Sequence, residues 1–218
     1  MTDTNILRLA GISGLLFLVL FIPSFLTAPD SPTSTTTHQD VLNYFNTRQG
    51  EILTQNGLLL IFAGFFFLLF LGVLHSVLQS VEGAGYGFSS VVLAGGLLFL
   101  ALMLGGAAFE IVHPATQVRF QNFRADAQLG FLSLALSGWM YRFAFAGMAA
   151  LIAATSLVAL RTGILPKWLA WAGFATAIVA LTRYVGPLGG WLALLWIAVV
   201  SVLMIVGAIS RSVHARSA

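Results

Sequence analysis

The sequence predicts an all-α fold, a polytopic membrane helical bundle with six transmembrane helices. Six long stretches without charged residues fill most of the 218-residue chain, and a helix needs about 20 apolar residues to cross a hydrocarbon core about 30 Å thick. Hydrophobic residues make up 59% of the chain and charged residues only 8%, whereas soluble domains carry about 25% charged residues. Backbone groups in lipid must be paired within the spanning segment, so apolar runs of this length form helices.

We expect a single transmembrane domain over residues 1–218. The expected spans cover about residues 6–28, 55–78, 88–112, 139–160, 168–185 and 191–210. The first apolar run is longer than the 7 to 15 residues typical of a secretory signal. We therefore expect it to be retained as a helix.

The connection between the first two spans predicts a short amphipathic helix on the outer surface. Thr37 followed three residues later by Asp40 resembles a capping box, which pairs free backbone groups at the start of a helix. Val41, Leu42 and Phe45 then fall on one helical face.

The connection before the fourth span predicts an interrupted helix. A continuous helix from Asp126 to Arg161 would be about 50 Å long, well beyond the thickness of the hydrocarbon core. We expect a break beside Gly138, ahead of the span over residues 139–160. Residues 127–137 then form an interfacial or a re-entrant segment, and a re-entrant segment is tolerated only where protein buries it or where it lines a cavity.

Loop charges favour a multi-pass protein of the inner (plasma) membrane with both termini cytoplasmic. In this orientation, equal numbers of arginine and lysine residues lie on the two sides of the membrane, so the orientation is inferred from their positions rather than from their number. Arg161 and Lys167 occupy a tight turn on the cytoplasmic side. Arg211 and Arg216 follow the last span, whereas the opposing cations lie mostly in long connections that translocate more readily.

Polar residues near the predicted outer ends of the spans form a candidate ligand-binding site. Lys167 and Arg183 are separated by about 24 Å of helix, less than the hydrocarbon thickness, so one of these cations reaches out from within it. Arg183 either extends its charge to the interface or points into the bundle and pairs with Glu110. The candidate cluster comprises Glu110, His113, Tyr141, Arg142, Arg183 and Tyr184.

Glu110 and His113 are also weak candidates for a metal site. Their Glu-x-x-His spacing places a carboxylate and an imidazole on one helical face, but only His38 and Asp40 are available to add ligands. An ion-paired Glu110 and His113 at the interface is the alternative interpretation. Phosphate-binding loops, nucleophile elbows and paired catalytic carboxylates are missing from the sequence, so we predict no catalytic residue.

Several segments resemble a group of small uncharacterised polytopic bacterial membrane proteins, mainly actinobacterial, that are grouped under domains of unknown function. The resemblance lies in residues 44–50, Ile52 and Leu53, residues 70–72 and Leu74, residues 91–96, residues 161–171, and Leu195 with Trp196. Its most specific piece is the turn around Lys167, where many members have arginine. The resemblance implies a bacterial inner-membrane bundle with no assigned reaction.

These observations favour a non-enzymatic integral membrane protein, either an accessory protein or one that binds a lipid or another small apolar ligand. A transporter of such a molecule is the alternative, and an intramembrane metalloenzyme is the third. The expected partners are membrane lipids and either another membrane complex or a second copy of the chain. A formal net charge of +3 is too small for a nucleic-acid interface. We predict no cofactor, although the 18 phenylalanines leave room for a bound lipid or carotenoid.

Overall fold

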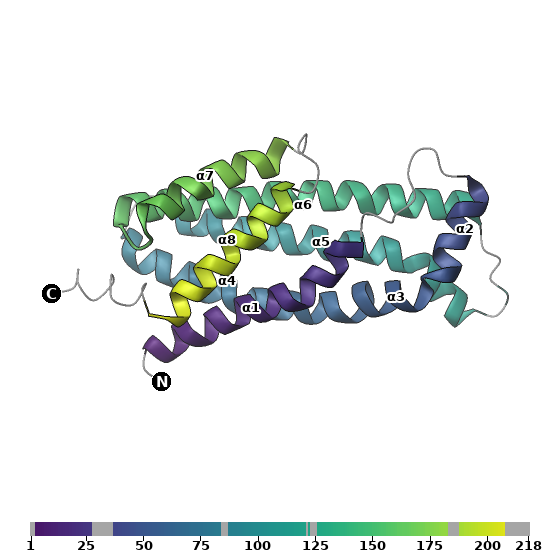
Figure 1. Cartoon of the computed structure of the whole chain (residues 1–218), viewed down its shortest axis with the longest axis horizontal. Coiled ribbons are helices and arrows are strands. Elements are labelled where there is room, and N and C mark those ends of the chain that lie inside the picture. Colours follow the sequence, from purple (N-terminus) through teal and green to yellow (C-terminus); the bar gives the residue numbers. More distant parts are fainter. Residues whose placement is uncertain are drawn as a thin grey trace.

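The computed structural model describes residues 3–27, 37–83, 87–120, 122, 126–182 and 188–207, and every regular element in these ranges is a helix (Figure 1). The elements are α1 (Asp3–Thr27), α2 (His38–Thr47), α3 (Gln49–Thr54), the π-helical stretch η2 (Gln55–Leu59), α4 (Leu60–Glu82), α5 (Phe88–Arg119), α6 (Ala127–Thr162), α7 (Lys167–Thr182) and α8 (Leu188–Ile205).

Five helical segments in the described ranges are long and apolar enough to cross a membrane. They lie in α1, in the continuous helix Gln49–Glu82, in α5, in α6 and in α8. The predicted helical class is confirmed. The fifth predicted span corresponds to α7, which has only 16 residues, so the count of six spans stays a prediction.

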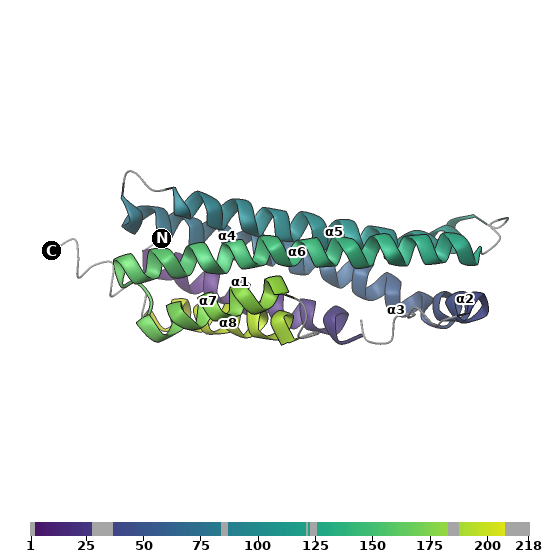
Figure 2. The same ribbon diagram turned by 90° about the horizontal axis from the view of Figure 1, so that it is seen from above.

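The six long elements pack in a closed order around the bundle, from α1 to α4, α5, α6, α7, α8 and back to α1. Figure 2 shows two layers, a long one formed by α5, α6 and the continuous helix Gln49–Glu82 that contains α4, and a short one formed by α1, α7 and α8. Phenylalanine rings fill the interior between the layers. The Phe67 ring of α4 lies 4.9 Å from that of Phe17 in α1 and 5.4 Å from that of Phe99 in α5.

α5 and α6 share the most extensive interface of the fold. Their backbones touch where Gly95 faces Gly147, because a Cβ atom added to Gly147 would lie 2.6 Å from the Gly95 carbonyl oxygen. Glycine permits this approach since it has no side chain. α6 then ends at Thr162, and the next residue, Gly163, has a φ of 64°, the left-handed conformation typical of a helix C-terminus.

The expected break beside Gly138 is wrong, because α6 continues through it for 36 residues, about 54 Å. Residues 127–137 are the first turns of α6 and form neither an interfacial nor a re-entrant segment of their own. One glycine in a helix costs only about 1 kcal/mol, and packing against a long neighbour outweighs it. Ser137 is buried, and its carbonyl oxygen lies against Gly106 of α5.

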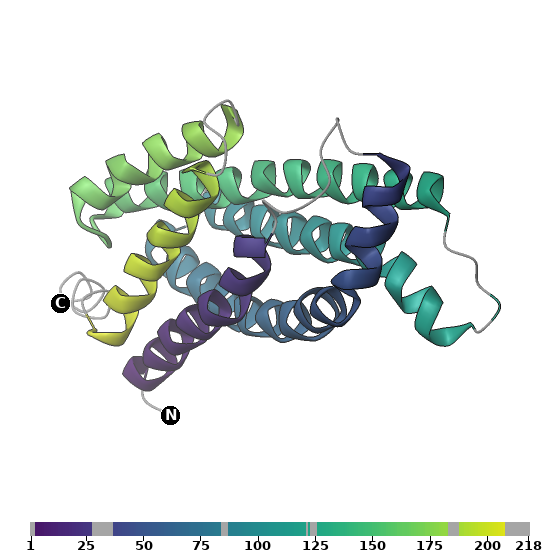
Figure 3. The ribbon, with the colours of Figure 1, turned by 45° about the vertical axis from the view of Figure 1, so that its right-hand side comes forward.

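The long helices project past the short layer and form a head at one end of the molecule (Figure 3). We define the head as α2, α3, the part of α5 from Glu110 to Arg119, and the part of α6 from Ala127 to Tyr141. The start of α1 and the end of α8 lie at the opposite end (Figure 1).

α2 begins at the predicted capping box and packs on the α5 and α6 parts of the head. The Thr37 backbone N–H donates to Asp40 Oδ2 at 2.9 Å, and the Asp40 N–H donates to Thr37 Oγ1 at 3.3 Å. The apolar face of α2 buries Val41 and Phe45 completely. Gly130 of α6 makes this packing possible, because a Cβ there would lie 2.8 Å from Val41 Cγ1.

Candidate functional site

Glu110 is the centre of a polar cluster where the head meets the rest of the bundle. Its side chain is only 9% exposed. Tyr141 of α6 donates its hydroxyl to Glu110 Oε2 at 2.9 Å, and Asn56 of η2 donates its amide to the same oxygen at 3.0 Å. Tyr44 of α2 donates its hydroxyl to Oε1 at 3.4 Å. One carboxylate therefore joins α5 to α2, η2 and α6.

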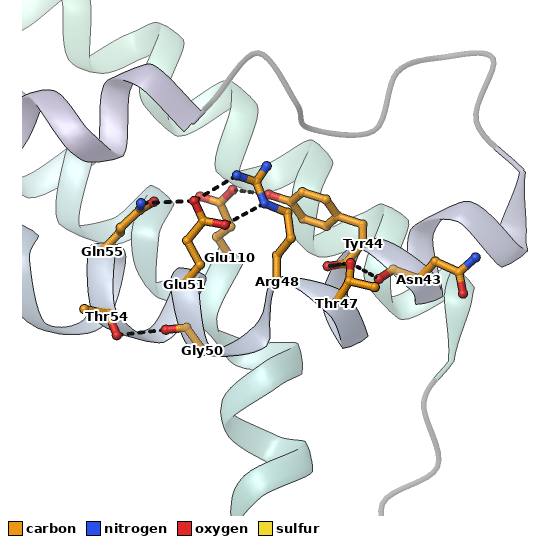
Figure 4. A network of polar contacts seen from close by, with 9 residues as sticks. All are labelled: Asn43, Tyr44, Thr47, Arg48, Gly50, Glu51, Thr54, Gln55 and Glu110. Atoms are coloured by element: carbon orange, nitrogen blue, oxygen red, sulfur yellow. Dashed lines mark hydrogen bonds and ion pairs between the residues drawn. The ribbon is translucent and has the colours of Figure 1, made fainter.

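An ion pair lies beside this carboxylate (Figure 4). Arg48 donates from Nε and Nη2 to the two oxygens of Glu51, at 2.8 and 2.9 Å. Gln55 donates its amide to Glu51 Oε1 at 3.2 Å. The Arg48 guanidinium lies 5.8 Å from the Tyr44 ring centroid, and its charge also attracts Glu110. Two-point pairing of arginine with a carboxylate fixes geometry as well as charge.

Two further hydrogen bonds tie the α2–α3 corner to α5 beyond Glu110. Gln49 donates its amide to the Pro114 carbonyl oxygen at 3.1 Å. Gln117 donates its amide to Asn46 Oδ1 at 3.1 Å. Since Tyr44 also binds Glu110, the α2–α3 corner is held to α5 over about two helical turns, from Glu110 to Gln117, and its position is determined by polar as well as apolar contacts.

His113 lies one turn beyond Glu110 and is completely buried. Its ring stacks on Phe45 of α2, with centroids 4.4 Å apart and an interplanar angle of 22°. The residues expected to complete a metal site lie elsewhere, since His38 packs edge-on against Phe131 and Asp40 serves the capping box. Within the described residues, no group of three or more His, Cys, Asp or Glu side chains is placed to hold a metal ion.

The structure brings together only part of the predicted cluster. Glu110 and Tyr141 are hydrogen-bonded as neighbours in the site. Arg142 is exposed, and its guanidinium stacks over Trp139 at 4.7 Å from the ring centroid. Arg183 and Tyr184 lie outside the described residues, so the expected pairing of Arg183 with Glu110 stays a prediction.

Four residues of the site were not among the predicted ones: Tyr44, Arg48, Glu51 and Asn56. Two signals in the sequence point to three of them, Arg48, Glu51 and Asn56. The Arg48–Glu51 spacing is the i,i+3 pattern of a helical ion pair. Asn56, together with Gln55, places an amide at the start of an apolar run, where a buried polar group needs a partner.

In the described residues, the Glu110 carboxylate is hydrogen-bonded by side chains of the protein. A carboxylate that accepts hydrogen bonds from three side chains is engaged by the protein itself, which suits a structural junction better than a nucleophile, a base or a metal ligand. No family model, curated protein or solved structure matches this chain. The resemblance to small bacterial membrane proteins therefore stays a prediction.

Proposed function

We propose that this chain is a non-enzymatic protein of the bacterial inner membrane that works by binding, either as an accessory subunit or as a holder of a lipid or another small apolar molecule. The observation that carries the proposal is the Glu110 cluster. The carboxylate buried at the base of the head is occupied by Tyr44, Asn56 and Tyr141. It is built to hold helices together rather than to react.

The proposed threading crosses the bilayer six times, with both termini and the α6–α7 turn on the cytoplasmic side. Arg161 and Arg142 are 19 residues apart on α6, which corresponds to about 28 Å of helix, close to the hydrocarbon thickness. Arg142 stacks on Trp139, and tryptophan and arginine together are typical of the headgroup level. The Glu110 cluster then lies at the outer boundary, because Tyr141 belongs to it, and the head lies beyond that boundary.

Native mass spectrometry of the chain in nanodiscs tests the binding role, with empty nanodiscs as the control. A lipid, another small apolar molecule or a protein present at a fixed stoichiometry supports the proposal. A chain recovered without any bound lipid, small apolar molecule or protein contradicts the proposal. If the bare chain also carries a lipid or small apolar solute across reconstituted vesicles, the transporter alternative replaces the binding role.

A further inference from the structure

α6 carries an apolar stripe on a face that its packing within the bundle leaves open. The stripe follows a spacing of three and four residues in alternation, and we name it the α6 seam. Its members are Leu129, Leu132, Leu136, Trp139, Phe143 and Ala146. This is the spacing of the a and d positions in a coiled coil. The seam is open to contact, since Leu132 is 57% exposed, Trp139 53% and Phe143 56%.

The upper part of the seam lies where lipid chains do not reach. This step rests on the threading proposed above, in which Arg142 marks the outer boundary. Leu136 is then about 9 Å and Leu129 about 20 Å farther out along α6. Trp139, Phe143 and Ala146 can face lipid, whereas Leu129, Leu132 and Leu136 face water or another protein. Covering these leucines with a protein partner would lower the free energy by about 25 cal/mol for each Å² of apolar surface removed from water.

We infer that a second copy of the chain covers the α6 seam, in a parallel dimer with its two-fold axis along the membrane normal. The seam has no charged residue at any of its six positions, so nothing in it repels an identical seam. A seam with apolar a and d positions packs on its own copy in a parallel coiled coil. Membrane insertion gives both copies the same direction, which is the arrangement that this pairing needs.

The exposed area of the seam reaches the lower bound for such a dimer. The five large side chains of the seam, at 38–57% exposure, present about 500 Å² per copy, so a dimer that covered all of this area would bury about 1,000 Å², the lower bound of specific interfaces. Arg142 lies at the flank of the seam, where it stacks on Trp139 of its own chain. It therefore borders the contact without entering it.

Cysteine cross-linking tests the inference cleanly, because the chain has no cysteine of its own. Leu132→Cys in native membranes, treated with a short bis-maleimide, should give a covalent dimer. Asn43→Cys is the matched control, since Asn43 is also exposed on the head but lies on α2. We expect at least about tenfold more dimer from the seam position than from the control. Equal yields from the two positions overturn the inference.

A second pair of variants tests the same contact without cross-linking. Leu132→Glu combined with Leu136→Glu places four carboxylates in the dimer seam and should weaken dimerisation at least about tenfold. Both residues are exposed in the single chain, so its folding and thermal unfolding should be preserved, as for the control Asn43→Glu. A dimer that survives both substitutions contradicts the inference.

The threading is judged separately by labelling Asn43→Cys in intact cells with a membrane-impermeant maleimide. Labelling from outside supports the outer placement of the head. If Asn43→Cys is labelled and Leu132→Cys stays monomeric, the dimer inference fails while the threading stands. If Asn43→Cys is protected, the threading fails, and the cross-linking yield still decides whether two copies meet at the seam.

Discussion

The Glu110 carboxylate offers about four lone-pair sites, and side chains from three other elements of the fold donate to them. Each donor is itself partly buried, so it would lose its hydrogen-bond partner if the carboxylate were removed. Leaving a buried donor unpaired costs about 1 to 3 kcal/mol. A single side chain therefore stabilises the meeting of α2, η2, α5 and α6.

Replacing Glu110 separates the role of its hydrogen bonds from the role of its charge. Glu110→Leu should lower the free energy of unfolding by about 2 to 4 kcal/mol, because three donors lose their acceptor. Glu110→Gln keeps a carbonyl oxygen for Tyr141 and Asn56, and its amide can donate to the Tyr44 hydroxyl, so the loss should stay below about 1.5 kcal/mol. Unfolding in a mixed detergent series measures both. Equal losses would show that charge, rather than hydrogen bonding, holds the junction.

The sequence indicated the depth of the polar residues but not the faces on which they lie. Glu110 and Tyr141 were grouped correctly, since they lie at one level of α5 and α6. Arg142 shares that level, but consecutive residues on a helix point about 100° apart, so it faces outward. Tyr44 and Asn56 escaped prediction because their contacts with Glu110 depend on how α2 and η2 pack against α5, which is non-local in the sequence.

Among the elements, α2 combines local and tertiary stabilisation. Its capping box was readable in the sequence because the pattern of Thr37 and Asp40 is local. Its buried face was also readable, from the spacing of Val41 and Phe45. The helices that α2 covers were not, since nothing in a ten-residue segment identifies its partner.

Lowering the pH should destabilise the first turn of α2. Hydrogen bonds from the Thr37 side chain and backbone hold the pKa of Asp40 below its ordinary value of 3.8. Because the folded-state pKa is lowered, the stabilisation is present above pH 3.8 and is lost as pH falls through the folded-state pKa. Hydrogen exchange of the first amides of α2 should therefore quicken relative to those of α6 in that range. Asp40→Asn should abolish this pH dependence, and an unchanged profile in the variant would contradict the assignment.

α6 shows why a length argument failed at the scale of one element. The limit of about 20 residues applies to a helix surrounded by lipid. α5 has 32 residues and the helix Gln49–Glu82 has 34, so α6 has a protein neighbour along its whole length. Where three long helices extend together, Gly138 is an ordinary helical position.

For the whole molecule, each apolar run of the sequence contributes to a helix in the described residues, but α7 has only 16 residues, so the number of spans stays a prediction. The closed order of these helices and the projecting head could not be predicted, since both depend on contacts between distant segments. The close crossing of α5 and α6 is the strongest of these contacts. Gly95 was visible as a small residue, but its partner Gly147 is recognisable only in the packed structure.

The crossing predicts opposite outcomes at two glycines of α6. Gly147→Val would push side-chain atoms into the Gly95 carbonyl oxygen and the Phe99 nitrogen, each 2.6 Å from the added Cβ, and should lower the free energy of unfolding by about 1 to 3 kcal/mol. Gly138→Ala is the control, because an added Cβ there meets no atom within 4 Å. It should raise the free energy of unfolding by up to about 1 kcal/mol. Thermal unfolding in detergent measures both, and a neutral Gly147→Val would refute the tight crossing.

The π-helical stretch η2 connects α3 to α4 through one widened helical turn. The Leu60 N–H bonds the Gln55 carbonyl, five residues earlier, whereas an α-helix would use the residue four earlier. Removing that extra residue from the turn would swivel α3 about 100° around the axis of α4. Arg48, Glu51 and α2 would rotate with it, while the phenylalanine-packed interior kept its place. The orientation of α2 and α3 relative to the rest of the bundle is thus set by the one extra residue in the η2 turn.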